Sequence, residues 1–225
     1  MVEEFEEVKK TKAFDAEAWF KKNQKTVLGG LLVLALGLGV YLYTREGGDD
    51  PEEIAASEAL FMAEHYFGQD SLEIALKGRP GDFEGFESIA SSQKGTDAGN
   101  VAHLYAGICH LNLGNFEKAI SYLKEFKGED QVMSSMAIGC QGDAQWELGK
   151  TQEAADLYVK AARNSNNRFT APMYLEKAAM VYELELKNTE KAIALYTEIR
   201  DDYYSSFQGS NSEKQLLRLT TAQQP

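Results

Sequence analysis

The sequence predicts an all-α protein in which one membrane-spanning helix precedes a solenoid of helical hairpins. Three observations lead to this prediction: an uncharged apolar run near the N-terminus, a short motif that recurs three times, and a composition that favours helix. Among its 225 residues the chain has only 4 prolines, and it is rich in Ala, Leu, Glu and Lys, which are strong helix formers.

The apolar run VLGGLLVLALGLGVYLY, with the threonines on either side, forms an uncharged stretch of 19 residues. As a helix this stretch would be about 28 Å long, close to the thickness of the hydrocarbon core of a bilayer. We therefore predict a transmembrane helix over residues 26–44. A cleaved signal peptide is the alternative, but the run starts late, is long for a signal, and lacks a cleavage site of small residues after it.

Basic residues beside the run predict its orientation. Six lysines precede it, and Arg45 is the only basic residue that follows before Lys77. Basic residues stay on the cytoplasmic side, so we expect the N-terminus in the cytoplasm. In a bacterium this describes a single-pass protein of the inner membrane, with a cytoplasmic arm over residues 1–25, a linker over residues 45–52 and a periplasmic domain over residues 53–225.

Small residues in the predicted span suggest a helix-packing face. Gly30 and Gly37 are seven residues apart and share a face, and Ala35 and Gly39 form a small-xxx-small pair. Small residues allow a second transmembrane helix to approach closely. Glycine is also common in membrane spans without such a role, so the pattern leaves both interpretations open.

The segment FDAEAWFKKNQK, residues 14–25, is predicted to form a short helix with Asp15 as its N-cap. Phe14, Ala18 and Trp19 would then lie on the inner membrane surface, with the neighbouring lysines beside anionic headgroups. Membrane lipid is therefore an expected partner of this segment.

The net charge of −12 resides outside the arm and the span, because the first 44 residues hold six lysines and six acidic residues. An acidic domain repels phosphate backbones, so we do not expect nucleic-acid binding. The two cysteines, Cys109 and Cys140, could form one disulfide or remain two buried thiols.

The recurring motif reads NLGNFEKAISYL at residues 112–123, ELGKTQEAADLY at residues 147–158 and ELKNTEKAIALY at residues 185–196. Aligned on the alanine that they share, the copies are 35 and 38 residues apart, a period typical of helical-hairpin repeats. Each unit is predicted to consist of a first helix, a tight turn and a second helix.

Small residues have a steric role in these predicted hairpins. Two antiparallel helices need small residues where their axes approach, and we expect Gly107 to face Ala119 and Gly142 to face Ala154. Larger side chains fill the space further along the second helix: Leu123, Tyr158 and Tyr196. Each pair then leaves an apolar face that only the next pair can cover, which predicts a solenoid.

This pattern resembles the tetratricopeptide repeat over residues 100–204, with two good units and one degenerate unit. In the third unit Met180 replaces the mid-helix glycine and Lys187 replaces the turn glycine, and the closing proline is missing from all three units. The resemblance implies a tetratricopeptide-like α-solenoid.

Three further segments flank these units. A weaker unit is predicted over residues 53–78, and an irregular insertion with one short helix over residues 83–91 follows it. A C-terminal capping helix is predicted over residues 210–219.

The whole layout resembles the membrane-anchored ancillary subunits of the bacterial Sec translocon. The lysine-bearing arm, the uncleaved span and the acidic repeat domain carry this resemblance. Residues 65–78 and 85–123, from HYFGQDSLEIALKG to NFEKAISYL, are also similar to Bacteroidota-type members of that family. The resemblance implies protein partners beside the translocation channel, namely translocon subunits, a membrane-tethered periplasmic chaperone and secreted chains.

No motif predicts an enzyme, a cofactor site or a metal site. His103 and His110 are two turns apart on one helix, about 10 Å by helical rise, which is too far to share a metal. The chain contains no GxSxG, P-loop, HExxH or CxxC motif.

A partner-binding groove is the remaining candidate site, because the first helices of stacked hairpins line a concave side. One stripe of these helices is predicted to form an apolar groove: Leu104, Ile108, Leu111, Met136, Trp146, Tyr174, Val181 and Leu184. Such a groove suits an extended or helical apolar segment of a partner. The chain's own C-terminal helix or the insertion could fill it instead.

These observations predict a non-catalytic, membrane-anchored scaffold for protein–protein interactions at the inner membrane. One alternative is a regulatory protein that acts through its cytoplasmic arm. Another is a scaffold subunit of a cell-envelope assembly complex. The sequence leaves the oligomeric state open.

Overall fold

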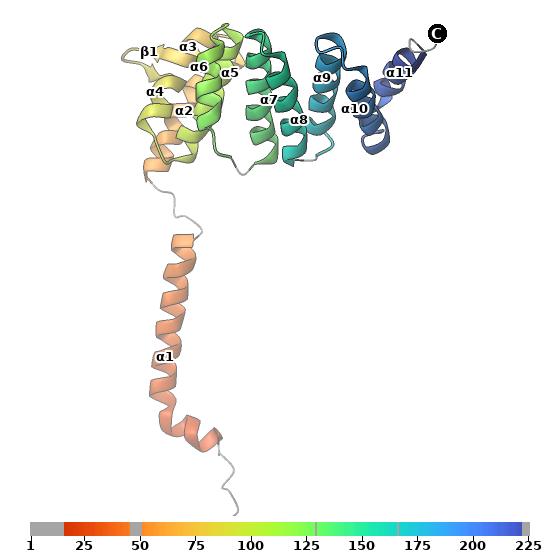
Figure 1. Ribbon diagram of the computed structural model, residues 1–225. Helices are drawn as coiled ribbons and strands as arrows, with labels where there is room; N and C mark the ends of the chain where they lie inside the picture. The colour runs from red at the N-terminus through yellow and green to blue at the C-terminus, as the bar shows by residue number, and fades with distance from the viewer. Residues whose placement is uncertain (1–15, 46–50, 129, 166, 222–225) are drawn as a thin grey trace, which may run out of the picture. The chain divides into compact units, whose positions relative to one another are not determined.

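The computed structural model describes four stretches of the chain, residues 16–45, 51–128, 130–165 and 167–221 (Figure 1). These stretches contain eleven helices and one small two-stranded sheet, which confirms the all-α fold. The chain divides into two compact units, Met1–Asp50 and Pro51–Pro225. The predicted N-cap Asp15 and the lysines before residue 16 lie outside the described residues.

The first unit contains one helix, α1, which extends from Ala16 to Arg45. Its stretch Trp19–Leu42 has a mean hydropathy of 1.9 and no buried residue, and it is long and apolar enough to cross a membrane. The short helix predicted over residues 14–25 is continuous with the apolar run, as the N-terminal part of α1. Figure 1 shows a bend in α1 close to this end.

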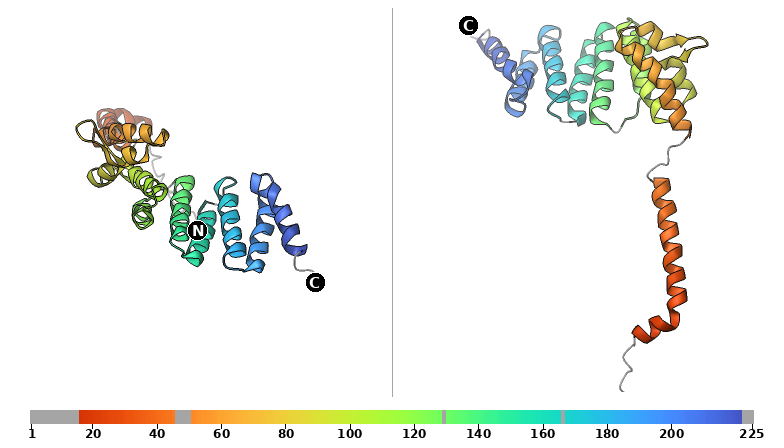
Figure 2. Two further views of the ribbon diagram at one scale, coloured as in Figure 1. Left: turned by 90° about the horizontal axis from the view of Figure 1, so that it is seen from above. Right: turned by 180° about the vertical axis from the view of Figure 1, so that it is seen from behind.

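The second unit is a series of helical hairpins. The helices pair as α2 (Pro51–Gly68) with α3 (Leu72–Lys77), α5 (Asp97–Asn112) with α6 (Phe116–Glu125), α7 (Gln131–Glu147) with α8 (Thr151–Ser165), and α9 (Thr170–Leu184) with α10 (Thr189–Asp202). Helix α11 (Phe207–Thr221) follows the last hairpin (Figure 1). Figure 2 shows the hairpins side by side in chain order. The tetratricopeptide-like solenoid is therefore confirmed.

The insertion lies between the first and second hairpins. It holds the antiparallel strands β1 (Gly78–Arg79) and β2 (Phe83–Glu84) and the short helix α4 (Phe86–Ser92). The sequence predicted the helix but not the strands, because two-residue strands leave no periodic pattern to recognise. Helix α4 buries Phe86 and Ile89 among side chains of α2 and α5, which attaches the insertion to the start of the solenoid.

The four hairpins share one turn geometry. In each, the residue five positions before a fully buried alanine has a positive φ: Asp70 (57°), Gly114 (77°), Gly149 (74°) and Lys187 (53°). The amide of each alanine then donates to the carbonyl four residues earlier, so the second helix begins at the same place in every unit. The weaker unit at the start thus belongs to the same series. Asp70 and Lys187 occupy a backbone region that favours glycine, at a cost of about 1–2 kcal/mol each.

The contact partner of Gly107 differs from the prediction. A Cβ atom on Gly107 would lie 2.5 Å from Cγ of Leu123, so the glycine faces Leu123 and not Ala119. A Cβ atom on Gly142 would lie 2.8 Å from the ring of Tyr158 and 3.4 Å from the carbonyl oxygen of Ala154. Helical side chains tilt toward the N-terminus of their helix, so the residue one turn after the alanine covers the glycine.

The core continues along the solenoid as three clusters. One joins α2, α3, α4 and α5, the next joins α5, α6 and α7, and the last extends from α8 to α11. Each cluster takes side chains from neighbouring hairpins, so no hairpin buries its apolar face alone.

We expect Gly107→Leu to destabilise the protein by about 1–3 kcal/mol, because the new side chain would overlap Leu123 and push α5 and α6 apart. Gly68→Ala is the matched control, since a Cβ atom on this helical glycine would meet nothing within 4 Å. Circular dichroism melts of the two variants and the parent chain measure the difference. An unchanged melting temperature for Gly107→Leu would contradict the close crossing of these helices.

Candidate protein-binding surface

The eight residues of the predicted groove lie at three different depths. Leu104, Tyr174 and Val181 are core residues with 2%, 3% and 1% exposure. Three more are half-buried: Ile108, Leu111 and Met136. Trp146 and Leu184 are 41% and 51% exposed. Of the eight, only these last two are exposed enough to offer substantial apolar area to a partner.

The packing of successive first helices explains the burial of Tyr174. Its ring occupies the space where a Cβ atom of Gly139 would stand, so α9 approaches the backbone of α7 closely. Leu104 of α5 is also buried against the next first helix, because it belongs to a core cluster with Ala137 and Ala144 of α7. The inner part of the predicted stripe is therefore a contact between repeats, and the sequence pattern alone does not distinguish it from an open groove.

An exposed apolar patch remains at the C-terminal ends of α7 and α9. We define this apolar patch as Trp146, Met180 and Leu184. Trp146 and Leu184 hold equivalent positions in successive repeats, and Met180, which is 41% exposed, lies one turn before Leu184. The sequence analysis did not identify Met180 as a surface residue, because it considered this position only as a departure from the mid-helix glycine of the repeat motif.

A pocket of about 220 Å³ adjoins the patch. Met180, Leu184 and Tyr196 form its apolar part, and its polar rim consists of Glu176, Glu183, Gln215 and Arg218. Burial raises the pKa of Tyr196 to about 12, so its hydroxyl stays protonated near neutral pH. The pocket can accept an apolar side chain beside a hydrogen-bonding rim.

One charged pair connects the second and third repeats next to the patch. Oδ1 of Asp143 on α7 accepts from Nζ of Lys177 on α9 at 2.6 Å and from the hydroxyl of Tyr158 at 2.6 Å. The Lys177 Nζ atom also lies 5.4 Å from the ring centroid of Tyr158 and 5.9 Å from that of Tyr174. Burial, followed by the hydrogen bond to Asp143, raises the pKa of Tyr158, which keeps its proton on the hydroxyl. The network fixes α7 against α9.

Helix α11 covers the end of the solenoid and leaves the patch exposed. Leu216 and Leu219 are buried in the last core cluster, and Arg218 pairs with Glu183 of α9 at 2.7 Å. Trp146 and Leu184 keep their exposure with α11 in this position. The insertion packs on the first repeats. Among the described residues, neither segment fills the surface at these two side chains.

The histidines and cysteines are separate structural groups. His110 is buried, with Nε2 at 3.0 Å from Oε1 of Glu87 on α4, and its ring stacks on Tyr122. Burial lowers the pKa of His110 and of His103, although Glu87 partly opposes the shift in His110. Cys109 and Cys140 are free, and burial raises the pKa of both thiols to about 12. Within the described residues no three His, Cys, Asp or Glu side chains could hold a metal.

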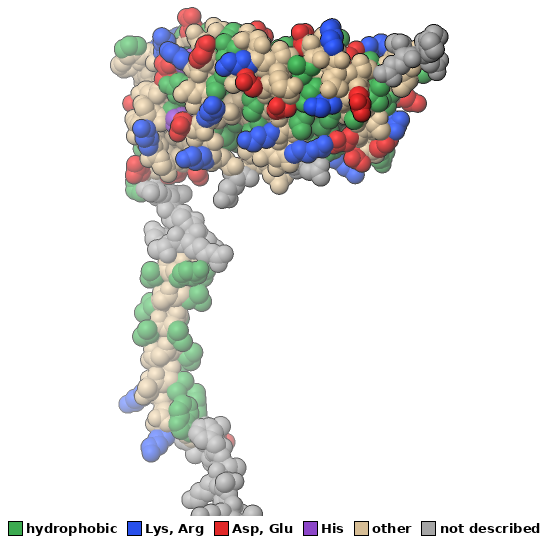
Figure 3. All heavy atoms as spheres, viewed as in Figure 1, with side chains coloured by type: hydrophobic (Ala, Val, Ile, Leu, Met, Phe, Trp, Pro, Cys, Tyr) green, Lys and Arg blue, Asp and Glu red, His purple; other side chains and the backbone are tan. Residues whose placement is uncertain are grey.

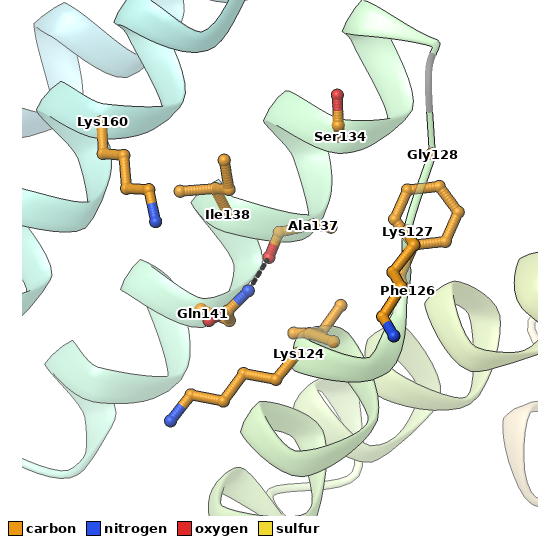
Figure 4. Close-up of a pocket in the computed structure, with 10 residues that line it drawn as sticks. Lys124, Phe126, Lys127, Gly128, Ser134, Ala137, Ile138, Gln141 and Lys160 are labelled. Atoms are coloured by element: carbon orange, nitrogen blue, oxygen red, sulfur yellow. Dashed lines mark hydrogen bonds between the residues drawn. The ribbon is translucent and has the colours of Figure 1, made fainter.

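A second pocket, of about 280 Å³, is lined by lysines (Figure 4). Lys124 of α6, Lys127 of the following loop and Lys160 of α8 surround it, and no acidic side chain lines it. Its walls also include Phe126, Ala137 and Ile138, and Gln141 donates to the carbonyl of Ala137 at 3.1 Å. This cationic pocket is unusual in a protein of net charge −12, and no sequence motif indicated it.

The small residues of the predicted span are exposed along α1. An added Cβ atom on Gly30, Gly37 or Gly39 would meet no described atom within 4 Å apart from chain neighbours and nearby backbone of α1, and Ala35 is exposed too. Packing of this face against another transmembrane helix therefore stays a prediction.

Comparison with known proteins defines the class of repeat. The family model described as Tetratricopeptide repeat matches residues 101–130 and 174–206. The first match covers most of α5, all of α6 and the loop after them, and the second covers most of α9, all of α10 and the loop before α11. No curated protein and no solved structure matches the chain. The chain thus contains tetratricopeptide repeats, which typically serve as non-catalytic scaffolds for protein interactions.

We expect the protein to lose stability as the pH falls below about 6.5, because His110 has a lowered pKa in the folded state. The unfolded chain then takes up a proton that the folded chain resists, and the equilibrium shifts toward unfolding. Melting temperatures at about pH 7.5 and 5.5, on either side of the ordinary histidine pKa, measure this loss. His110→Gln should reduce the loss, and His65→Gln, at an exposed position, is the matched control. An equal loss in all three proteins would contradict the role of His110.

Proposed function

We propose that this protein is a membrane-anchored scaffold without catalytic activity, which holds partner proteins at the inner membrane of a bacterium. Helix α1 is the anchor, and the repeat domain is the periplasmic part that binds. The observation that supports this proposal most directly is the apolar patch, which exposes a tryptophan and a leucine at equivalent positions of successive repeats. Aromatic anchors of this kind tend to dominate the energy of an interface.

The chemistry of the patch favours an apolar segment of a partner. Trp146, Met180 and Leu184 offer apolar surface, and the adjoining pocket adds space for one side chain. The nearby charge of Lys177 is neutralised by Asp143, so the patch carries no unpaired charge from this pair. An amphipathic helix could place its apolar face on this surface and its polar face beside the charged rim of the pocket.

We further propose that the protein is an accessory of the Sec translocon, with periplasmic chaperones or emerging secreted chains as its partners. The layout of arm, span and acidic repeat domain supports this finer proposal through its resemblance to the ancillary subunits. An apolar patch also suits chains that have left a channel before they have folded. Affinity purification in mild detergent, with partners identified by mass, tests it. Recovery of envelope-assembly enzymes, or of a cytoplasmic factor bound to residues 1–26, would replace it.

The proposed orientation predicts the behaviour of topology reporters. Alkaline phosphatase is active only outside the cytoplasm, so its fusion after Pro225 should be active and its insertion before residue 20 should be silent. A reporter that is active only in the cytoplasm should give the opposite result at both positions. The reverse pattern for both reporters would place the repeat domain in the cytoplasm.

We expect the double variant Trp146→Ala and Leu184→Ser to lose its co-purifying partner while its melting temperature changes little. Both side chains are substantially exposed, so their loss removes interface area and little of the core. Phe61→Ser is the matched control, because Phe61 is 65% exposed on α2, far along the solenoid from the patch. Retained binding by the double variant would exclude the patch as the partner site.

A further inference from the structure

One edge of the repeat domain carries the start of α2 and all the loops that join one hairpin to the next. We call it the loop edge, and it consists of residues 51–54, 93–97, 126–128, 167–169 and 203–207. The tight turns with positive φ lie at the opposite ends of the helices, on the turn edge. Figure 1 shows the two sets of connections at opposite ends of the stacked helices.

Side-chain contacts join the loop edge from one hairpin to the next. The carboxylate of Glu53 on α2 accepts from the backbone N–H groups of Asp97 and Ala98, at 3.0 and 3.1 Å. Asn100 exchanges two hydrogen bonds of 2.9 Å with the backbone of Lys127. These contacts hold the start of α2 beside the start of α5, and the start of α5 beside the loop that joins α6 to α7.

Further contacts on this edge join helices within one hairpin and between hairpins in the later repeats. Nδ2 of Asn164, near the end of α8, donates to Oγ of Ser134, near the start of α7, at 2.9 Å. Arg163 on α8 forms an ion pair with Glu198 on α10. The loop edge is therefore one continuous surface from the first residue of α2 to the start of α11.

The most exposed large apolar side chains of the repeat domain all lie on this edge. Phe169, Tyr204 and Phe207 are 74%, 70% and 75% exposed. They belong to two neighbouring connections, α8–α9 and α10–α11, and no described segment of the chain covers them. Exposed aromatic side chains at the tips of loops are typical of surfaces that enter the boundary between headgroups and acyl chains.

Basic side chains accompany these aromatics. Five of them lie on or beside the loop edge without an ion pair to any described residue: Lys94, Lys124, Lys127, Lys160 and Arg168. Three of the five form the cationic pocket in Figure 4. Acids also lie on or beside this edge: Glu53 and Asp130 accept from backbone N–H groups, Asp201 pairs with Arg200, and Asp97 and Glu125 line one pocket with Lys94 and Lys127. Figure 3 shows basic and acidic side chains interspersed on one face of the domain.

The length of the connection to α1 limits how far the start of this edge can be from a membrane. Helix α1 ends at Arg45 and α2 begins at Pro51. Six Cα–Cα steps reach at most about 20 Å. If α1 spans the bilayer, the chain therefore keeps Pro51, at one end of the loop edge, within about 20 Å of the last residue of α1.

We propose that the loop edge binds the surface of the bilayer that α1 crosses. Phe169, Tyr204 and Phe207 enter the headgroup and acyl boundary to a depth of about 5–10 Å, and the lysines contact phosphates of anionic headgroups. This inference rests on the proposed membrane anchor. It also gives the apolar patch a defined position, because Trp146 lies at the far end of α7, about 20 Å from the loop edge by helical rise. The patch would then face away from the lipid, toward partners.

The depth of a fluorescent label in the full-length protein tests this proposal. The chain is reconstituted into vesicles of phosphatidylcholine and phosphatidylglycerol, with Cys109→Ala and Cys140→Ala. An environment-sensitive dye is attached at Arg168→Cys on the loop edge or at Lys150→Cys on the turn edge. We expect a blue shift at position 168 and quenching by lipids that carry a nitroxide near the headgroup. The dye at position 150 should behave as it does in water.

The triple variant Phe169→Ser, Tyr204→Ser and Phe207→Ser tests the aromatic side chains. In the Arg168→Cys background it should abolish most of the quenching, while the melting temperature stays near that of the parent because Phe169, Tyr204 and Phe207 are exposed. Unchanged quenching in this variant would contradict their role.

Extraction with alkaline carbonate distinguishes a failure of this inference from a failure of the proposed membrane anchor. A chain that carbonate releases from the vesicles would overturn the anchor and the inference together. A retained chain with no quenching at position 168 would overturn the inference alone and leave the anchored scaffold in place.

Discussion

The close crossing of two helices in each hairpin is the constraint on which the rest of the domain depends. Alanines at the start of the second helices, such as Ala119 and Ala154, have no exposed surface, and Gly107 and Gly142 leave no room for a Cβ atom. Because the helices approach so closely, the chain must reverse within a very tight turn. That turn requires a residue with left-handed backbone, and all four hairpins supply one.

The alternation of tight turns and longer loops gives the domain two unlike edges. The turn edge is fixed by hairpin geometry, so its residues serve mainly to reverse the chain. The loop edge joins separate hairpins and tolerates varied lengths and side chains, and there the exposed aromatics and the cationic pocket occur. The surface that we propose for lipid and the surface that we propose for protein thus lie at opposite ends of the same helices.

The hairpin of α9 and α10 shows how a departure from the repeat motif can create an exposed apolar surface. Met180 replaces the glycine that lets the earlier pairs close tightly, and its side chain is 41% exposed beside Leu184 and the pocket next to α11. Lys187 keeps the turn with a positive φ although glycine would adopt it at lower cost. The same substitutions that make the motif degenerate in sequence therefore produce part of the apolar patch.

The sequence by itself determined the order of elements. The apolar run, the three copies of the turn motif and the buried alanines follow from local patterns, because helix period, turn chemistry and side-chain size act over a few residues. The sequence pattern also correctly assigned Leu123, Tyr158 and Tyr196 to the interior. The sequence pattern placed Gly107 against Ala119, whereas its contact is Leu123, one turn further along α6. The spacing of residues in the sequence does not reveal how side chains tilt along a helix.

Only the tertiary structure decided which side of each helix stays in water. Leu104, Tyr174 and Val181 share the predicted stripe with Trp146 and Leu184, yet the neighbouring repeat buries the first three and leaves the other two exposed. A periodic pattern identifies an apolar face but not what covers it, because burial depends on where α7 and α9 pack against each other. The loop edge is likewise invisible in sequence, since its segments are up to about 150 residues apart and meet only through the stacking of the hairpins.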